Sequence, residues 1–481
     1  MSDLVERNPV ISTPGSLARR LGLRDAVVIG LAAMIGAGAF VSLGAAQDLA
    51  GALAPLAVLL AAGVALCNAT STAQLAAQHP AAGGTYHFGR QQLGPWWGFL
   101  AGWCFVIGKI ASCAAMALVI AAYLVPEPAQ RIVAALVVVV LTAVNLVGVT
   151  RTAALARVLV TIALTALVLT GVRLAIGLAT GATGTGGDAA GDATAGAADG
   201  VRTADGMIAG LADATPGPLA GSAAGLWDGG LAAVLSAGSG GAVGIVLAVA
   251  QAAALMFFAF AGYARVATLG EEVTEPRRTI PRAVLIALGI VAVLYLTLSV
   301  LLVLVGPAPG DQGWGPAPFL TALRSVGAGG AWSVVITVGA VAAAGGALLA
   351  LVAGISRTAL AMARQRDLPP VLAHVSPRFA VPQRAEIVAG LAVLALVLLA
   401  GDVLVAIAAS AFGVLLYYAI ANLAALTQVG EWRLFPKAMQ VLGLCGCVLL
   451  VVALPGSTIA VGAVLVLLGL AYRGIVLAAR R

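Results

Sequence analysis

Long, uncharged apolar stretches recur along the whole chain, each about as long as a helix needs to cross a bilayer. A spanning helix requires roughly 20 apolar residues, and the pattern predicts about twelve of them, with glycine, proline and charged residues between. The ninth, eleventh and twelfth are short, and only Pro455-Gly456 separates the last two. The predicted spans are 26–48, 52–78, 94–123, 132–149, 157–178, 243–265, 283–306, 331–356, 386–401, 404–428, 438–454 and 457–473.

Two of these spans carry glycine in the middle, where a helix that only had to span would carry Leu or Val. The first contains Gly36 and Gly38, and the sixth contains Gly262. Unwound backbone is costly in hydrocarbon because its N–H and C=O groups find no water. Interrupted spans in corresponding halves of a polytopic chain therefore indicate a transporter's central binding site.

Composition and charge support a multi-pass membrane protein. Hydrophobic residues make up 61% of the 481 residues and charged residues only 9%, against about 25% charged in soluble proteins. With the N-terminus inside, 21 of the 26 Lys and Arg residues fall on the cytoplasmic side, as the positive-inside rule requires. The even number of spans returns the C-terminus to the cytoplasm. The net charge of +7 thus reflects topology, and no nucleic-acid partner is expected.

Residues 179–242 interrupt the apolar pattern. The segment is rich in Gly, Ala, Thr and Asp, and such a composition buries too little apolar surface to order itself. We expect a flexible external loop, with a lid or partner-binding role as the alternative. No cleavable signal peptide is expected in residues 1–24, and the five cysteines are interpreted as small core residues. The chain shows no nucleotide loop, metal cluster or nucleophile–base pair, so neither an enzyme nor a cofactor is predicted.

Four sequence blocks resemble a known family. They are Ile35-Gly-Ala-Gly-Ala-Phe40; Pro80-Ala-Ala-Gly-Gly-Thr-Tyr86 with Leu93-Gly-Pro and Gly102-Trp103; Phe257 through Glu271-Glu-Val-Thr-Glu-Pro-Arg-Arg-Thr-Ile-Pro-Arg282; and Ala353 through Arg364 with Arg366-Asp-Leu-Pro369. Together they are similar to permeases of the amino acid–polyamine–organocation superfamily, closest in pattern to its cationic amino acid transporter branch. The Glu-Glu-Val…Pro-Arg-Arg…Ile-Pro-Arg block is the most specific of the four.

The resemblance implies an all-α fold of the LeuT type, with two inverted five-helix repeats, spans one and six broken, and transport by alternating access. The expected divisions are a cytoplasmic segment 1–24, repeats 25–178 and 243–428 on either side of the 179–242 loop, and a final part 429–481 with the last two spans and the cytoplasmic C-terminus.

An amino acid suits such a site because backbone groups can compensate both of its charges. The free N–H groups of Gly36, Ala37 and Gly38 begin the second half of span one, where a carboxylate is favoured. By motif position the ammonium group faces carbonyls of Phe258, Ala259, Ala261 and Met34. The alternative is that the glycines only allow close helix packing. The predicted substrate-binding residues are Met34, Ile35, Gly36, Ala37, Gly38, Phe258, Ala259, Phe260, Ala261 and Gly262.

Lys109 is the one lysine inside a predicted span and one of two in the chain. An intramembrane ionisable group indicates function by default, because a desolvated lysine can release its proton. The resemblance places a lysine of proton-coupled permeases at Ala163 and an acidic residue at Gly108, and both are absent. We interpret Lys109 as a relocated coupling residue, with a packed or snorkelling side chain as the alternative.

The resemblance also suggests gating by the Phe258 ring, with an ordinary packed core ring as the alternative. The charged residues after span six are interpreted as a gating or docking ion network, with a solvated loop as the alternative: Glu271, Glu272, Arg277 and Arg278. Between Val338 and Gly354 no hydroxyl, amide or carboxylate side chain is available for sodium, so proton coupling is favoured. The leading hypothesis is a proton-coupled amino acid symporter of the inner (plasma) membrane, with the bilayer, the proton and the amino acid as partners. The alternatives are an exchanger and a permease-fold sensor or partner subunit that does not translocate.

Overall fold

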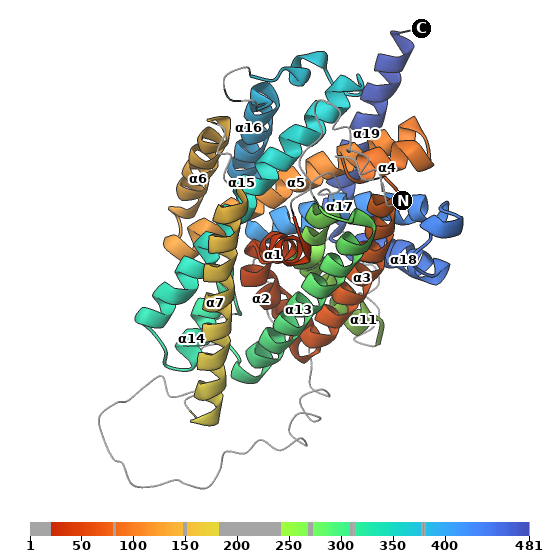
Figure 1. Ribbon diagram of the computed structural model, residues 1–481. Coiled ribbons are helices and arrows are strands. Elements are labelled where there is room, and N and C mark those ends of the chain that lie inside the picture. The colour runs from red at the N-terminus through yellow and green to blue at the C-terminus, as the bar shows by residue number, and fades with distance from the viewer. Residues whose placement is uncertain are drawn as a thin grey trace, which may run out of the picture.

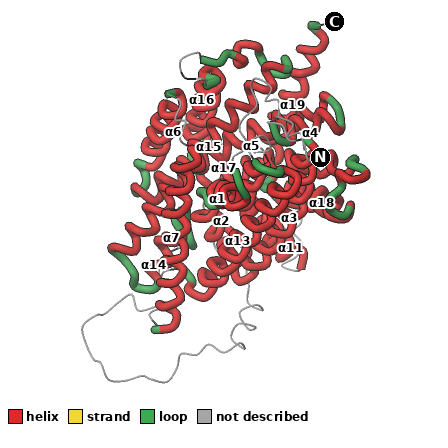
Figure 2. The backbone as a smooth tube through the Cα atoms, in the orientation of Figure 1, coloured by secondary structure: helices red, strands yellow, loops and turns green. Residues whose placement is uncertain are grey.

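The computed structural model describes residues 21–79, 83–147, 152–181, 242–267, 273–307, 311, 313–376, 379 and 381–480. These residues form helices joined by short connections, and no strand is found among them (Figure 2). The all-α fold class predicted from the sequence is confirmed. Residues 182–241 of the expected external loop, residues 1–20, and the predicted gating pair Glu271 and Glu272 lie outside the described residues.

The first half of the chain supplies five predicted spans and one short connecting helix. Span one is divided into two helices, and α4 connects spans two and three. The helices are α1 Leu23–Met34, α2 Ala37–Ala50, α3 Ala54–Gln78, α4 Thr85–Gln92, α5 Pro95–Leu124, α6 Gln130–Leu146 and α7 Thr152–Ala179.

The second half supplies the remaining seven spans, and the sixth is again divided. The helices are α11 Ala242–Phe260, η3 Ala261–Tyr263, α12 Ala264–Ala267, α13 Pro276–Val305, α14 Pro318–Ser325, α15 Ala331–Arg364, α16 Gln383–Ala400, α17 Val403–Leu426, α18 Lys437–Ala453 and α19 Gly456–Ala478. In the described part, nine helical stretches are long and apolar enough to span a bilayer; one of them, Ala37–Gln78, joins the second half of span one to span two. The shorter apolar helices α6 and α18 match spans four and eleven.

Helix edges differ most from the prediction where polar residues extend a helix beyond its apolar stretch. Span eight was expected to end at residue 356, but α15 continues to Arg364. Likewise, α13 begins at Pro276, seven residues before the predicted start of span seven. Proline is compatible with the first turn of a helix because its missing N–H has no partner there.

Helix α1 lies at the centre of the bundle (Figure 1), with α7, α13 and α15 against it. Helix α11 packs on α2 and α3 and reaches α17 and α18. Both broken spans are therefore interior elements, enclosed by longer helices whose outer faces carry exposed Leu, Ile and Val. This is the arrangement in which unwound backbone is tolerated at membrane depth.

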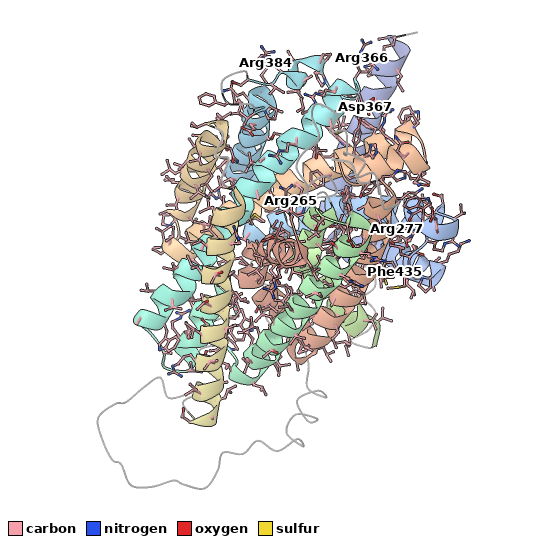
Figure 3. The ribbon with its side chains drawn as sticks, in the orientation of Figure 1. Arg265, Arg277, Arg366, Asp367, Arg384 and Phe435 are labelled. Atoms are coloured by element: carbon pink, nitrogen blue, oxygen red, sulfur yellow. The ribbon has the colours of Figure 1, made fainter. Side chains whose placement is uncertain are left out.

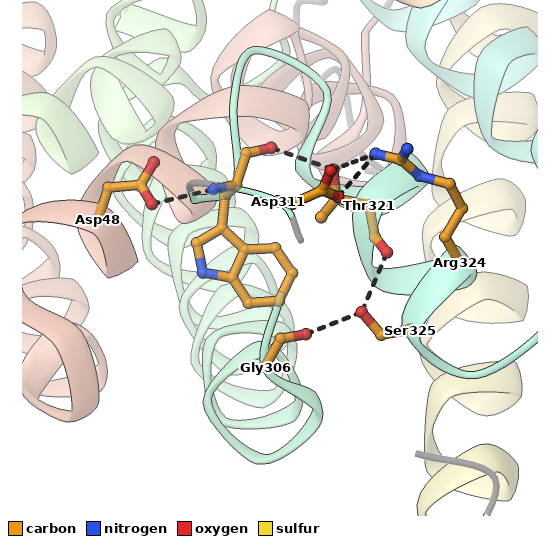
Figure 4. A network of polar contacts seen from close by, with 7 residues as sticks. Asp48, Gly306, Asp311, Thr321, Arg324 and Ser325 are labelled. Carbon is orange, nitrogen blue, oxygen red and sulfur yellow. Dashed lines mark hydrogen bonds and ion pairs between the residues drawn. The ribbon is translucent and has the colours of Figure 1, made fainter. Parts of the chain in front are cut away.

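A polar network fixes the segment between α13 and α14 to the far end of α2 (Figure 4). The Trp314 N–H donates to a carboxylate oxygen of Asp48 at 3.0 Å, and the Thr321 hydroxyl donates to the Trp314 carbonyl at 3.3 Å. Arg324 pairs with Asp311 at 3.0 Å. The C-terminal end of α2 is thus held against α14, while the start of α2 lies at the break in span one.

Candidate functional site: the junction of two broken helices

The break in span one leaves a helix N-terminus with free amides. Helix α1 ends at Met34, and Ile35 departs from helical geometry with ψ of 76°. The Gly36 N–H turns back to the Met34 carbonyl at 2.9 Å. The amides of Ala37 and Gly38, which begin α2, donate no hydrogen bond to any described residue. Two donors at the positive end of a helix dipole are the arrangement that favours a carboxylate.

The break in span six lies directly against the break in span one. After Phe260 the α-helix gives way to one 3₁₀ turn, Ala261–Tyr263. A Cβ on Gly262 would lie 2.0 Å from the Ala33 carbonyl oxygen, and one on Gly38 would lie 2.6 Å from the Ala259 Cα. Only glycine permits such an approach of two backbones. The structure therefore brings the predicted residues of the two spans together at one junction.

The three glycines at this junction have different surroundings. At Gly38 and Gly262, backbone atoms of the other span occupy the place of a side chain, as close helix packing requires. Gly36 differs: a Cβ there would be 3.3 Å from the Ala347 Cβ and 3.7 Å from the Met116 Cε, both side-chain atoms. Its φ of −118° is open to any residue. Gly36 is therefore the position where lack of bulk bears most directly on ligand approach.

Two tyrosines that the sequence analysis did not single out bind carbonyls at the breaks. The Tyr295 hydroxyl of α13 donates to the Met34 carbonyl at 2.9 Å. The Tyr418 hydroxyl of α17 donates to the Ala261 carbonyl at 3.0 Å. Both rings are fully buried. The only sequence signal was their rarity, since the chain has 7 tyrosines, most of them outside the recognised motifs.

Phe258 differs from the other rings at the end of α11. Phe257 packs edge-on against Tyr418 with ring centres 5.7 Å apart, and Phe260 against Tyr295 at 5.2 Å. Phe258 enters no ring pair among the described residues, and 8% of its surface is exposed, whereas Phe257 and Phe260 are fully buried. Phe260 therefore packs on a ring of α13, whereas Phe258 is the least enclosed of the three rings.

Lys109 lies in the middle of α5, where α5 crosses α17. The crossing is close because Gly108 faces Gly413 and Val414, so a Cβ on Gly108 would be 3.1 Å from the Val414 amide nitrogen. An acidic side chain would not fit there. The Lys109 side chain is 7% exposed, and no ion pair or hydrogen bond to another described residue is found for it. Met116, two helical turns further on the same face of α5, reaches Gly36.

The predicted gating arginines have partners at the start of α13. Arg277 pairs with Glu431 at 3.3 Å and lies over the Trp432 ring at 4.8 Å. Arg278 lies 3.9 Å from Glu275. Arg277 therefore ties α13 to the segment before α18. Its gating role stays a prediction, as do the other predicted roles of single residues.

A buried ion cluster just beyond the C-terminal end of α15 was also not predicted from the sequence. Asp367 accepts hydrogen bonds from Tyr86, Arg90 and Arg473, and it lies near the C-terminal end of the chain, beside Arg366 (Figure 3). Arg473 also stacks on the Phe99 ring at 4.9 Å. The cluster joins α4 and α19 to the segment that follows α15. No sequence spacing indicated it, because Asp367 lies 277 positions from Arg90 and 106 positions from Arg473.

A bundle of membrane-spanning helices with two interior breaks in contact defines the class of this protein, a membrane transporter. The chain belongs to the amino acid permease family, whose model matches residues 21–475.

Among its relatives is an uncharacterized transporter of Mycobacterium bovis, 46% identical over 96% of this chain and 92% of that protein. A vacuolar cationic amino acid transporter of Arabidopsis thaliana is 27% identical over 82% of this chain and 62% of its own length. Among solved structures, a Na⁺-coupled sialic acid symporter in an outward-open state matches with a TM-score of 0.54 at 13% identity, over 92% of this chain and 90% of that one. That likeness shows the fold alone.

Proposed function

We propose that this protein is a secondary active transporter that moves an amino acid by proton symport through alternating access. The observation that carries the proposal is the junction of the two breaks: free amides of Ala37 and Gly38 on one side, and carbonyls near Ala261 on the other. An amino acid carries a carboxylate and an ammonium group on one carbon, and these fit N–H donors on one side of the junction and carbonyl acceptors on the other. Neither charge then requires a charged side chain at membrane depth, which would be expensive.

The substrate that fits is a neutral amino acid. The described side chains next to the junction include Met116, Ala347 and Phe258, and none of the described carboxylates forms part of it. A cationic side chain would stay unpaired there, and Lys109 would repel it. We therefore do not propose cationic amino acids, which the plant relative is named for, as substrates of this protein.

Lys109 is the proposed coupling residue. It is buried at the middle of α5 without a counter-ion among the described residues, and the face it shares with Met116 leads to Gly36. Beside it the Ser112 and Ser410 hydroxyls join α5 to α17 at 2.6 Å. A lysine in these surroundings can exchange a proton during the cycle, whereas an arginine cannot. Loss or gain of that charge alters the α5–α17 crossing beside the substrate junction.

We further propose that the protein resides in the plasma (inner) membrane with both termini in the cytoplasm. The arginine distribution supports this orientation, because Lys and Arg concentrate in cytoplasmic connections. Exchange without a proton, and binding without translocation, remain as the two outcomes that would replace symport.

The test is uptake by purified protein in lipid vesicles, with each of the twenty common amino acids, with and without an inward pH gradient. The wild type should accumulate at least one neutral amino acid only under the gradient. Lys109→Ala and Lys109→Arg should lose gradient-driven uptake while still binding that amino acid. The exposed Lys437, the other lysine of the chain, supplies the matched control as Lys437→Ala. Full gradient-driven uptake by Lys109→Ala would return Lys109 to a packing role, and uptake only against preloaded amino acid would indicate exchange.

A further inference from the structure

Three tyrosine hydroxyls donate to backbone carbonyls of the broken spans. Tyr295 binds the Met34 carbonyl, Tyr418 the Ala261 carbonyl, and Tyr123 the Phe40 carbonyl, at 2.9, 3.0 and 2.9 Å. Met34 and Ala261 lie at the breaks, whereas Phe40 lies inside α2. Two of the three hydroxyls are thus bound to the carbonyls that the proposed function assigns to the substrate's ammonium group.

The Met34 carbonyl is fully occupied. A carbonyl oxygen has two lone pairs, and this one accepts both the Gly36 N–H and the Tyr295 hydroxyl, each at 2.9 Å. An ammonium group can bind the same oxygen only if one donor leaves. The Gly36 amide belongs to the turn that shapes the break, so the hydroxyl of Tyr295 is the donor that can move without unfolding it.

We infer that the Tyr295 hydroxyl occupies the place of the substrate's ammonium group on the Met34 carbonyl. When the substrate binds, its ammonium group displaces the hydroxyl from that carbonyl. This inference rests on the proposed function. The exchange conserves hydrogen bonds at the carbonyl: one O–H donor leaves and one N–H donor takes its place. Tyr418 stands in the same relation to Ala261 on the opposite side of the junction.

Displacement of the Tyr295 hydroxyl also changes the contacts between helices of the bundle. The Tyr295 hydroxyl is a polar link between α13 and the end of α1, while its ring packs on Phe260 of α11. Displacing the hydroxyl removes the link and leaves the ring contact in place. Substrate binding would thereby remove one polar constraint between α1 and α13 at the break, while the packing of the two helices remains. A ligand without an ammonium group would not remove it.

Tyr295→Phe tests the inference by equilibrium binding to the purified full chain, with each of the twenty common amino acids as probe. Phenylalanine keeps the ring and removes the competing donor, so the dissociation constant of the amino acid that binds the wild type should fall about fivefold. Affinity for the corresponding des-amino acid, for example 4-methylpentanoate where L-leucine is the amino acid, should not change. Tyr418→Phe should shift binding in the same direction.

Tyr123→Phe is the matched control, because it removes the same kind of hydrogen bond at the same length but away from the breaks. It should leave amino acid affinity unchanged. Weaker or unchanged binding by Tyr295→Phe would overturn the inference, and so would an equal gain for the des-amino acid. Failure of the wild type to bind any of the twenty amino acids would instead overturn the proposed function itself.

Discussion

Replacement of Gly262 by alanine should break the junction of the two broken helices. A Cβ at this position would lie 2.0 Å from the Ala33 carbonyl oxygen, 2.2 Å from the Ala33 carbonyl carbon and 2.5 Å from the Met34 amide nitrogen, where ordinary contact begins at 3.4 Å. All three obstacles are backbone atoms, so no side chain can rotate away. The two spans must separate, and over-packing of this kind costs about 3 kcal/mol.

Gly262 lies in a 3₁₀ turn and not in an α-helix, so the helix preference of alanine does not offset this loss. The assay is unfolding of the purified protein in mixed micelles of increasing SDS content, followed by tryptophan fluorescence. Gly63→Ala serves as control, because Gly63 is exposed on α3 and its Cβ would meet nothing within 4 Å. Gly36→Ala should also be tolerated. Equal stability of Gly262→Ala and Gly63→Ala would refute the direct contact of the two breaks.

Three further outcomes are expected. In competition binding, neutral amino acids should displace a bound neutral amino acid, and arginine or lysine should not; preference for either cation would reject the substrate assignment. Asp367→Asn should lower the unfolding free energy by about 3 kcal/mol, since it leaves the buried Arg473 without its counter-ion, whereas Arg277→Gln, whose side chain is 46% exposed, should cost below about 1 kcal/mol. Burial lowers the pKa of His79 and of His87 below the ordinary value of 6.5, so at lower pH the unfolded chain binds more protons than the folded one. The melting temperature should therefore be independent of these histidines above pH 6.5 and fall below it. The double variant His79→Gln with His87→Gln should reduce that fall.

The sequence predicted the helices and the two breaks because both follow from local chemistry. Apolar length sets the spans, and the glycines at positions 36, 38 and 262 set the breaks. The spans come out within a few residues wherever polarity changes sharply at the membrane edge. Where α15 and α13 continue as polar helix, hydropathy alone placed the edges too early or too late.

The tyrosine contacts and the Asp367 cluster could not be predicted in the same way. Tyr295 and Met34 are 261 positions apart, and Arg473 and Asp367 are 106 apart, so only the folded bundle brings them together. The role of Gly38 also depends on the bundle, since its contact with Ala259 of span six decides between ligand approach and helix packing. The sequence predicts which glycines lie at the breaks, but only the packing of the two spans shows how the surroundings of Gly36 and Gly38 differ.

The central claim is that an amino acid binds at the junction of the two breaks, with its carboxylate on the amides that begin α2. The most direct measurement is the dissociation constant of the transported neutral amino acid for purified Gly36→Val, with Gly63→Val as control. The valine methyls would fill the space toward Met116 and Ala347 and block the amides of Ala37 and Gly38. We predict loss of detectable binding by Gly36→Val in a folded protein, and binding like the wild type by Gly63→Val. Undiminished binding by Gly36→Val would contradict the assignment of the site.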